Sequence, residues 1–276
     1  MSDLNSPVTI PPELTASNPV VAVAQKLRAP RRSGLFREAR MFLEFPRLMF
    51  QAVDLARQPR GTGQPVIILP GYGAGDGSTA ILKAYLRMLG YHVRGWRLGR
   101  NTGNVGELLP RVLKRLISFS RRTGQDVNLI GWSLGGYLAR ELARERPDLV
   151  RHVITLGTPV IGGPKYTVVA RAYRRRGLDV EALAAEVDLR NQTLLQTRVT
   201  AIYSRIDAVV AWEACIDRAT VNIEHVEVAT SHLGLGFSPE VYKIIAQRLA
   251  HDAIGGRPAS EKIWQPASRF GNGPRR

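Results

Sequence analysis

Short apolar runs alternate with helical patterns over most of the chain from residue 65 onward. Six runs predict strands, at 65–69, 91–96, 127–132, 150–156, 198–203 and 222–228. Apolar residues spaced three and four apart predict helices at 78–89, 108–119, 134–146 and 238–251. Strands without alternating polar positions are typical of a parallel sheet that is buried on both faces. The pattern therefore predicts an α/β fold, with a mostly parallel sheet of about six strands and helices on both faces.

Three regions break this alternation. Residues 161–196 are long, helical in places and basic, and we interpret them as a helical cap insertion over the end of the sheet. Residues 1–60 are expected to form an N-terminal helical extension, and 61–252 the α/β domain. Residues 253–276 are rich in Gly, Pro, Ser and Arg and are expected to form a disordered tail.

The N-terminal extension carries a broad apolar stripe over residues 33–57, with arginines on its polar side. Pro46 is expected to kink this helix or split it in two. A basic amphipathic helix can lie on a membrane surface, but such a stripe more often packs on its own domain. The packing interpretation is favoured, and the membrane interpretation stays open.

The clearest chemical signal lies where the strand at 127–132 meets the next helix, in the segment G-W-S-L-G at 131–135. G-x-S-x-G between a strand and a helix is the pattern of a nucleophile elbow. Its serine takes a strained backbone conformation, and side chains at Gly131 and Gly135 would collide with the turn. Ser133 is expected to be exposed above the sheet end, near the positive end of a helix dipole. The alternative is an ordinary glycine-rich turn.

A serine nucleophile needs a base, and the base needs a carboxylate that orients it. In a parallel sheet these partners should follow later strands, at the carboxyl edge. Of the five histidines, His232 alone lies in a loop just after a late strand, and it is the candidate base. Asp207, after the strand at 198–203, is the candidate acid, and Asp217 is its alternative.

The oxyanion of a tetrahedral intermediate needs two preorganised N–H donors. The backbone N–H of Leu134, which follows the candidate nucleophile, is one. The other is expected from the loop P-G-Y-G at 70–73, with Tyr72 as donor. This loop could also be read as a phosphate cradle, although the Gly-Lys-Ser/Thr sequence of a Walker motif does not follow it.

Composition narrows the class of protein further. The apolar share of 44% fits a globular chain. The formal charge of +16 is interpreted first as that of a soluble enzyme from a cell with arginine-rich proteins, and attraction to an anionic surface is the alternative. No nucleic-acid-binding module is visible, so the charge leaves an arginine-rich enzyme or peripheral contact with an anionic membrane. The single cysteine, the lack of a secretory signal and the lack of a spanning apolar run favour the cytoplasm, with the membrane surface as an alternative. No Cys/His cluster has metal spacing, and neither metal nor organic cofactor is expected.

Five motifs appear in a fixed order along the chain. They are V-I-I-L-P-G-Y-G at 66–73, G-W-S-L-G-G at 131–136, L-G-T-P at 156–159, S-R-I-D-A-V-V at 204–210 and S-H-L-G-L at 231–235. Together they resemble the α/β-hydrolase superfamily, in particular bacterial lipases and esterases, from about residue 66 to 249. The chain departs from that pattern at Pro70, where lipases often have histidine, and it lacks evidence for the first two strands of the full fold.

The resemblance implies a catalytic triad of Ser133, Asp207 and His232, with Tyr72 and Leu134 as oxyanion donors. It implies a serine hydrolase that cleaves carboxylic esters, of small molecules or lipids, through an acyl-enzyme. Two alternatives stay open at this point. One is an acyltransferase on the same fold, and the other is a non-catalytic binding protein of this fold.

Overall fold

The computed structural model describes residues 27–30 and 32–254. The N-terminal extension before residue 27 and nearly all of the tail expected from residue 253 lie outside this range. Six strands are present in the described part: β1 (Pro65–Leu69), β2 (His92–Gly95), β3 (Val127–Trp132), β4 (Val150–Leu156), β5 (Arg198–Tyr203) and β6 (Ile223–Glu227). They form one sheet in the order β2-β1-β3-β4-β5-β6, and every neighbouring pair is parallel. The predicted fold class is confirmed.

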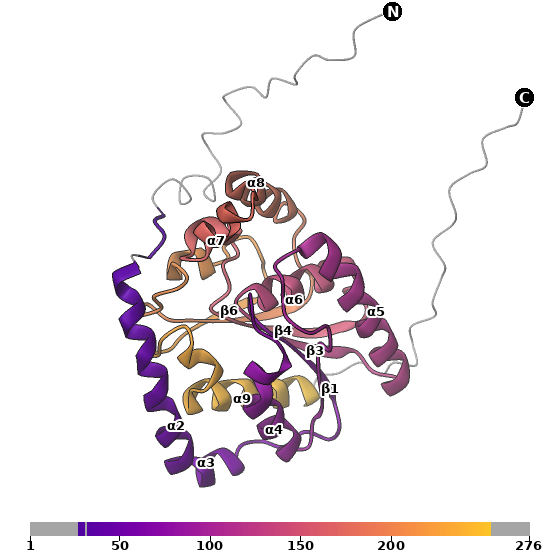
Figure 1. Ribbon diagram of the computed structural model, residues 1–276. Helices are drawn as coiled ribbons and strands as arrows, with labels where there is room; N and C mark the ends of the chain where they lie inside the picture. The colour runs from indigo at the N-terminus through magenta and orange to yellow at the C-terminus, as the bar shows by residue number, and fades with distance from the viewer. Residues whose placement is uncertain (1–26, 31, 255–276) are drawn as a thin grey trace, which may run out of the picture.

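Helices cover both faces of this sheet (Figure 1). One face carries α5 (Val105–Thr123) and α6 (Leu134–Glu145), and the other carries α4 (Ala80–Met88) and α9 (Pro239–Ile254). Alternate strand residues supply the two cores, as the two-residue period of a strand requires. In β1, Val66 and Ile68 join the core with α4 and α9, while Ile67 and Leu69 join the core with α5 and α6.

The parallel arrangement brings four loops to one edge of the sheet. Ser133 follows β3, Thr158 follows β4, Asp207 lies in the loop after β5, and His232 in the loop after β6. Because β3, β4, β5 and β6 are consecutive neighbours, these loops are adjacent although they span a hundred residues of sequence. This edge is where open α/β sheets place their ligands.

A helical segment between β4 and β5 occupies the place expected for the cap insertion. It contains the 3-10 helix η4 (Gly163–Tyr166), α7 (Ala170–Arg175) and α8 (Val180–Arg190). Figure 1 shows α7 and α8 together above the sheet edge, apart from the helices on its two faces. Lys165 of η4 forms an ion pair with Glu181 of α8 at 2.6 Å, which ties the two elements together.

The N-terminal helices run along one margin of the domain (Figure 1). They are the 3-10 helix η2 (Arg32–Arg40), α2 (Met41–Phe50) and α3 (Ala52–Ala56). Pro46 does not split the helix in two, which was one of the two expected effects, because it lies inside α2 and the interruption falls at Gln51. Pro46 stands only six residues into α2, so its missing N–H removes one hydrogen bond near the helix start.

The interpretation that the apolar stripe packs on its own domain holds for only part of it. Phe45 stacks against Phe237, Leu55 is buried, and Leu48 packs on the core with α4 and α9. Six other large apolar side chains of these helices are exposed to solvent: Phe36, Phe42, Leu43, Met49, Phe50 and Val53. No helix in the described part of the chain is long and apolar enough to span a bilayer.

Candidate active site

The turn between β3 and α6 holds Ser133 in a strained conformation. Its φ of 54° and ψ of −121° lie in a region that residues with side chains rarely adopt. A Cβ on Gly131 would lie 2.3 Å from the carbonyl oxygen of Gly135, and one on Gly135 would lie 2.3 Å from that of Leu69. The two glycines therefore allow the turn to close against α6 and β1, as the sequence pattern predicts.

Neighbouring loops brace this turn. The Ser133 N–H donates to the Leu156 carbonyl at 2.8 Å, and the Thr158 hydroxyl donates to the Ser133 carbonyl at 2.9 Å. Both partners belong to the L-G-T-P segment at the end of β4. The Ser133 side chain is half-buried and lines a pocket, where the sequence suggested a fully exposed residue. The strain at Ser133 is thus held by hydrogen bonds from two sides.

Asp207 and His232 form a buried pair. The Nδ1 of His232 lies 2.6 Å from Oδ2 of Asp207, and each residue is less than a tenth exposed. The second carboxylate oxygen, Oδ1, accepts the backbone N–H groups of Val209 at 2.8 Å and Val210 at 2.7 Å. Because these three bonds fix the carboxylate, it can hold the imidazole in one tautomer and one orientation.

The surroundings of His232 act on its pKa in opposite directions. Burial lowers the pKa of the imidazole, but the charge and hydrogen bond of Asp207 and the charge of Glu38 outweigh it. The pKa of His232 therefore lies above its ordinary value. This is the behaviour expected of a base whose protonated form is stabilised by a fixed carboxylate.

The loop of His232 is also tied to the residue before Ser133. Trp132 Nε1 donates to the His232 carbonyl at 3.2 Å, and the two rings lie 6.3 Å apart. Within residues 27–30 and 32–254, no hydrogen bond joins the Ser133 hydroxyl to the imidazole. Such bonds are often long in the absence of substrate, and they tighten when substrate binds.

Asp217, the alternative acid, has a different partner. Its carboxylate forms a buried ion pair with Arg140 of α6 at 2.5 Å and accepts the Thr220 hydroxyl at 2.6 Å. Burial raises the pKa of Asp217, but Arg140 and these hydrogen bonds outweigh it and lower the pKa to about 2. In the structure, Asp217 therefore pairs with Arg140, whereas Asp207 pairs with His232.

Glu38, in the 3-10 helix η2, contacts the loops that carry Asp207 and His232 and was not found by the sequence analysis. Its Oε1 accepts the N–H of Ala208 at 3.0 Å and that of His232 at 3.2 Å. Its Oε2 accepts the N–H of Leu233 at 2.8 Å. Glu38 is buried, so one carboxylate joins the loop after β5 to the loop after β6. Six residues later, in α2, Glu44 accepts the hydroxyl of Thr230 at 2.7 Å.

The loop predicted to supply Tyr72 as an oxyanion donor lies against Ser133. A Cβ on Gly71 would lie 3.4 Å from the Ser133 Cβ. In the described part of the chain the Tyr72 N–H has no acceptor. Leu134 is the first residue of α6, and its N–H accordingly has no acceptor within the helix. Both donors remain free for a ligand.

Asn101 holds this loop in place, and the sequence analysis missed it as well. It is fully buried, and its side-chain amide donates to the Pro70 carbonyl at 2.9 Å. Its backbone carbonyl accepts the Gly73 N–H at 2.8 Å, and its own N–H donates to Ala74 at 2.8 Å. A single residue from the loop after β2 therefore fixes the backbone on both sides of Tyr72.

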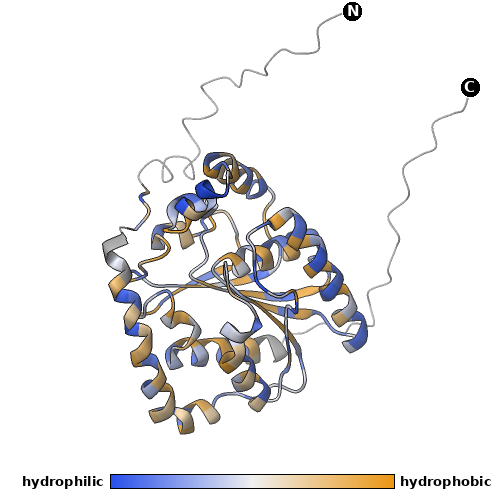
Figure 2. Cartoon of the chain, in the orientation of Figure 1, coloured by the Kyte–Doolittle hydropathy of each residue, from blue (hydrophilic) through white to orange (hydrophobic). Residues whose placement is uncertain are grey.

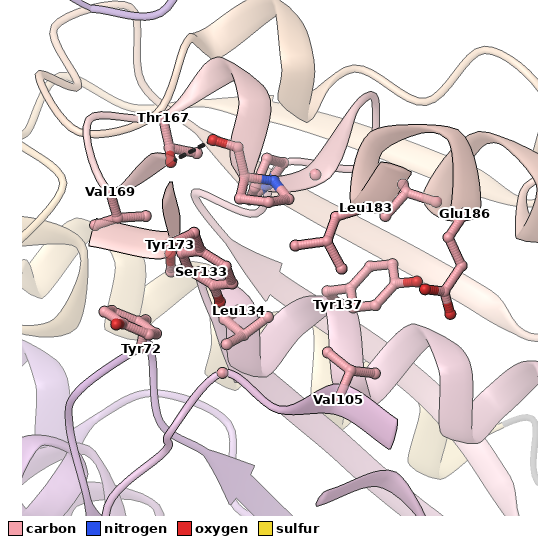
Figure 3. Close-up of a pocket in the computed structure, with 15 residues that line it drawn as sticks. Tyr72, Val105, Ser133, Leu134, Tyr137, Thr167, Val169, Tyr173, Leu183 and Glu186 are labelled. Atoms are coloured by element: carbon pink, nitrogen blue, oxygen red, sulfur yellow. Dashed lines mark hydrogen bonds between the residues drawn. The ribbon is translucent and has the colours of Figure 1, made fainter. Parts of the chain in front are cut away.

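A pocket of about 70 Å³ opens beside Ser133, beneath the cap (Figure 3). Leu134 and Tyr137 come from α6, Tyr173 from α7, and Leu183 and Val187 from α8. Figure 3 shows Tyr72 and Val105 completing the wall on the side opposite the cap. Apart from Glu186 and the hydroxyl groups, the lining is apolar. Among the described residues, no group of three or more His, Cys, Asp or Glu side chains could hold a metal ion.

Comparison with known proteins agrees with this fold. The family described as alpha/beta hydrolase fold matches residues 64–212. A metagenome-derived lipolytic enzyme superposes with a TM-score of 0.57 at 14% identity, over 72% of this chain and 96% of that one. The Bacillus licheniformis lipase BlEst2 gives 0.54 at 14% identity, over 70% and 94%. A putative aryl esterase from Burkholderia cenocepacia gives 0.52 at 16% identity, over 72% and 94%. At these identities the likeness concerns the fold. The family match covers more than half of the chain, and the protein therefore belongs to the α/β-hydrolase fold family.

Proposed function

We propose that this protein is a serine hydrolase that cleaves carboxylic esters through an acyl-enzyme. The observation that carries the proposal is the 2.6 Å hydrogen bond between Asp207 and His232, at the same sheet edge as the strained Ser133 turn. Ser133 is the nucleophile, His232 the general base and Asp207 the residue that orients it. The lipolytic and esterase functions of the structurally similar proteins agree with this assignment.

In the first half of the reaction, the Ser133 Oγ attacks the ester carbonyl carbon while His232 Nε2 takes the hydroxyl proton. The carbonyl oxygen becomes an oxyanion and accepts the N–H groups of Tyr72 and Leu134. The intermediate then collapses with cleavage of the bond to the alkoxy oxygen. His232 returns its proton to the departing alcohol, and the acyl group remains on Ser133.

In the second half, water replaces the alcohol. His232 takes a proton from this water, the resulting hydroxide attacks the acyl carbonyl, and the same two N–H groups bind the oxyanion. Collapse releases the carboxylic acid and restores the Ser133 hydroxyl with the proton from His232. The Asp207 side chain stabilises the imidazolium that forms in each half.

Two further residues act through these groups. Glu38 is a positioning residue, because it fixes the backbone N–H groups of Ala208 and His232 relative to one another. Asn101 is a positioning residue for the oxyanion donor, because it binds the carbonyl of Pro70. A misplacement of either loop by about 1 Å would reduce the rate strongly, since the reacting atoms must be aligned.

The pocket favours a short acyl group. Its apolar walls suit a hydrocarbon chain, and a volume of about 70 Å³ accommodates roughly five water-sized groups. Acyl chains of a few carbons fit beneath the cap as it stands. Longer chains would extend beyond this volume.

The direct test is hydrolysis of p-nitrophenyl esters from acetate to palmitate, with wild type beside Ser133→Ala. We expect the highest kcat/KM for short acyl groups and no activity above background in the variant. Equal rates for wild type and variant, or no hydrolysis of any ester, would contradict the proposal. Product transfer to an added alcohol in preference to water would instead identify an acyltransferase.

A further inference from the structure

The outer side of the N-terminal helices carries six exposed apolar side chains, which we call the outer stripe: Phe36, Phe42, Leu43, Met49, Phe50 and Val53. Their exposed fractions range from 60% for Leu43 to 88% for Phe50. Thirteen large apolar side chains are exposed in the described part of the chain, and six of them lie in these eighteen residues. Scattered exposed apolar residues are ordinary, whereas a concentration of this kind marks a surface that binds something.

Four residues of the outer stripe share one face of α2, because they recur at nearly two helical turns. Phe42 and Met49 are seven residues apart, and Leu43 and Phe50 repeat the same spacing, while Phe36 and Val53 flank them in η2 and α3. The opposite side of these helices is occupied, since Phe45 and Leu48 pack on the domain there. Figure 2 shows hydrophobic colour along α2 and α3 at the margin of the described part of the molecule.

The charges around the outer stripe are of one sign. Arg37, Arg40 and Arg57 are exposed along the same helices. The carboxylates of this segment are engaged: Glu38 is buried, Glu44 is buried and pairs with Arg47 at 3.0 Å, and Asp54 forms an ion pair with Lys243 of α9. The exposed face therefore combines large apolar side chains with arginines and without a free carboxylate among its described residues.

We propose that the outer stripe docks this protein on a lipid surface that carries anionic headgroups. Phenylalanine, leucine and methionine side chains enter the boundary between headgroups and acyl chains, while the arginines bind lipid phosphates. A second copy of the chain fits this face less well, because self-association would bring two sets of arginines together. An anionic lipid surface offers acyl chains to the apolar side chains and phosphates to the arginines.

Docking at this face would place lipid close to the candidate active site. Glu38, between Phe36 and Phe42 in sequence, turns inward and binds the loops of Asp207 and His232. The bilayer boundary and these loops would then be separated by about one helix diameter, roughly 10 Å. The docking itself does not depend on catalysis, so it can be tested on inactive protein.

The experiment is sedimentation of the full chain, as Ser133→Ala, with two kinds of vesicle. One consists of phosphatidylcholine, and the other contains about one third phosphatidylglycerol. We expect binding to the anionic vesicles at low salt, and weaker binding as NaCl rises from about 0.05 to about 0.5 M. Absence of binding to anionic vesicles at low salt would overturn the proposal.

Two variants test the two components of the surface. Phe42→Ser with Phe50→Ser is expected to weaken binding to anionic vesicles by about tenfold or more, because two inserted side chains are lost. Arg37→Gln with Arg40→Gln is expected to weaken it by roughly fivefold for each charge and to reduce its dependence on salt. All four residues are exposed, so these substitutions should leave the fold intact.

The matched control replaces exposed apolar residues elsewhere, Leu189→Ser in α8 with Val221→Ser before β6. It should bind vesicles as the parent protein does. Equal losses in the control and in the helix variant would overturn the assignment to the outer stripe. So would a stable dimer, seen by sedimentation velocity without lipid, that the Phe42→Ser and Phe50→Ser variant converts to monomer.

Discussion

The strand-end loops and the N-terminal helices build the candidate active site in different ways. Ser133, Asp207 and His232 lie where strands end, and local sequence places each of them. Glu38 reaches the same site from more than 160 residues away, through three backbone N–H groups. In the proposed mechanism the loops supply the reacting groups, while the N-terminal helices hold two of those loops together. A chemical group can be recognised from its own sequence neighbourhood, but the residue that positions it cannot.

The largest expected effect comes from Ser133, in one of the loops that follow the strands. Ser133→Ala removes the nucleophile, and kcat/KM for a short p-nitrophenyl ester should fall on the order of 10⁶-fold. The variant should keep the wild-type melting temperature, because alanine retains the Cβ and only a hydroxyl group is lost. An activity within tenfold of wild type would show that the nucleophile lies elsewhere.

Asp207→Asn should reduce kcat by about 10⁴-fold, because an amide cannot hold the imidazole in the required tautomer. Asp217→Asn is the matched control, since Asp217 is the other buried aspartate after β5. It should leave kcat nearly unchanged but lower the free energy of unfolding at pH 7 by about 3–5 kcal/mol, because Arg140 loses its buried partner. If Asp217→Asn lost kcat and Asp207→Asn lost only stability, Asp217 would be the acid.

The Asp217 pair also predicts a pH dependence of stability. Its folded pKa, about 2, lies below the ordinary value near 3.9, so its stabilisation is complete above that ordinary value. The stabilisation is lost as pH falls through about 2. The difference in unfolding free energy between wild type and Asp217→Asn should therefore shrink between about pH 4 and pH 2, as measured by urea denaturation.

Glu38 gives the next largest effect and tests the N-terminal helices. Glu38→Ala leaves the N–H groups of Ala208, His232 and Leu233 without an acceptor, and kcat/KM should fall by about 10- to 100-fold. Glu38→Gln keeps one side-chain acceptor, so its loss of kcat/KM should be smaller.

Both variants remove a charge that raises the pKa of His232. Because His232 must be uncharged to act as a base, the acid limb of the kcat/KM profile should move to lower pH. An unmoved acid limb would mean that Glu38 is only structural.

The smallest expected effect comes from the outer face of the same helices. Phe42→Ser with Phe50→Ser should change kcat/KM for a soluble ester by less than about twofold, because both side chains point away from the domain. The same steady-state assay used for Glu38 serves here. A large loss on a soluble substrate would show that the outer face, too, supports the active site.

The sequence predicted the sheet closely because its strands are buried on both faces and read as continuous apolar runs. The bounds of β3, β4 and β5 agree with the prediction, and those of β2 and β6 differ by one or two residues. The Ser133 turn was predictable for a similar reason. A side chain on Gly131 would collide with Gly135, only four positions away, and a side chain on Gly135 would collide with Leu69 of β1.

Other features depend on long-range packing and were not predictable. Nothing near Glu38 in the sequence distinguishes it from a surface glutamate, because its partners lie at residues 208, 232 and 233. Asn101 likewise reads as part of a polar loop, and only the fold reveals that it is buried against Pro70. The outer stripe was expected to pack inward, since an apolar pattern alone does not say which of two apolar faces the domain covers.

The most direct test of the central claim is to trap the acyl-enzyme. Wild-type protein is mixed with excess p-nitrophenyl butyrate, quenched in acid within the first turnovers, digested and examined by mass spectrometry. We predict a butyryl group on the peptide that contains Ser133, and none in Ser133→Ala. Hydrolysis without any acylated peptide, or acylation of a different residue, would contradict the account.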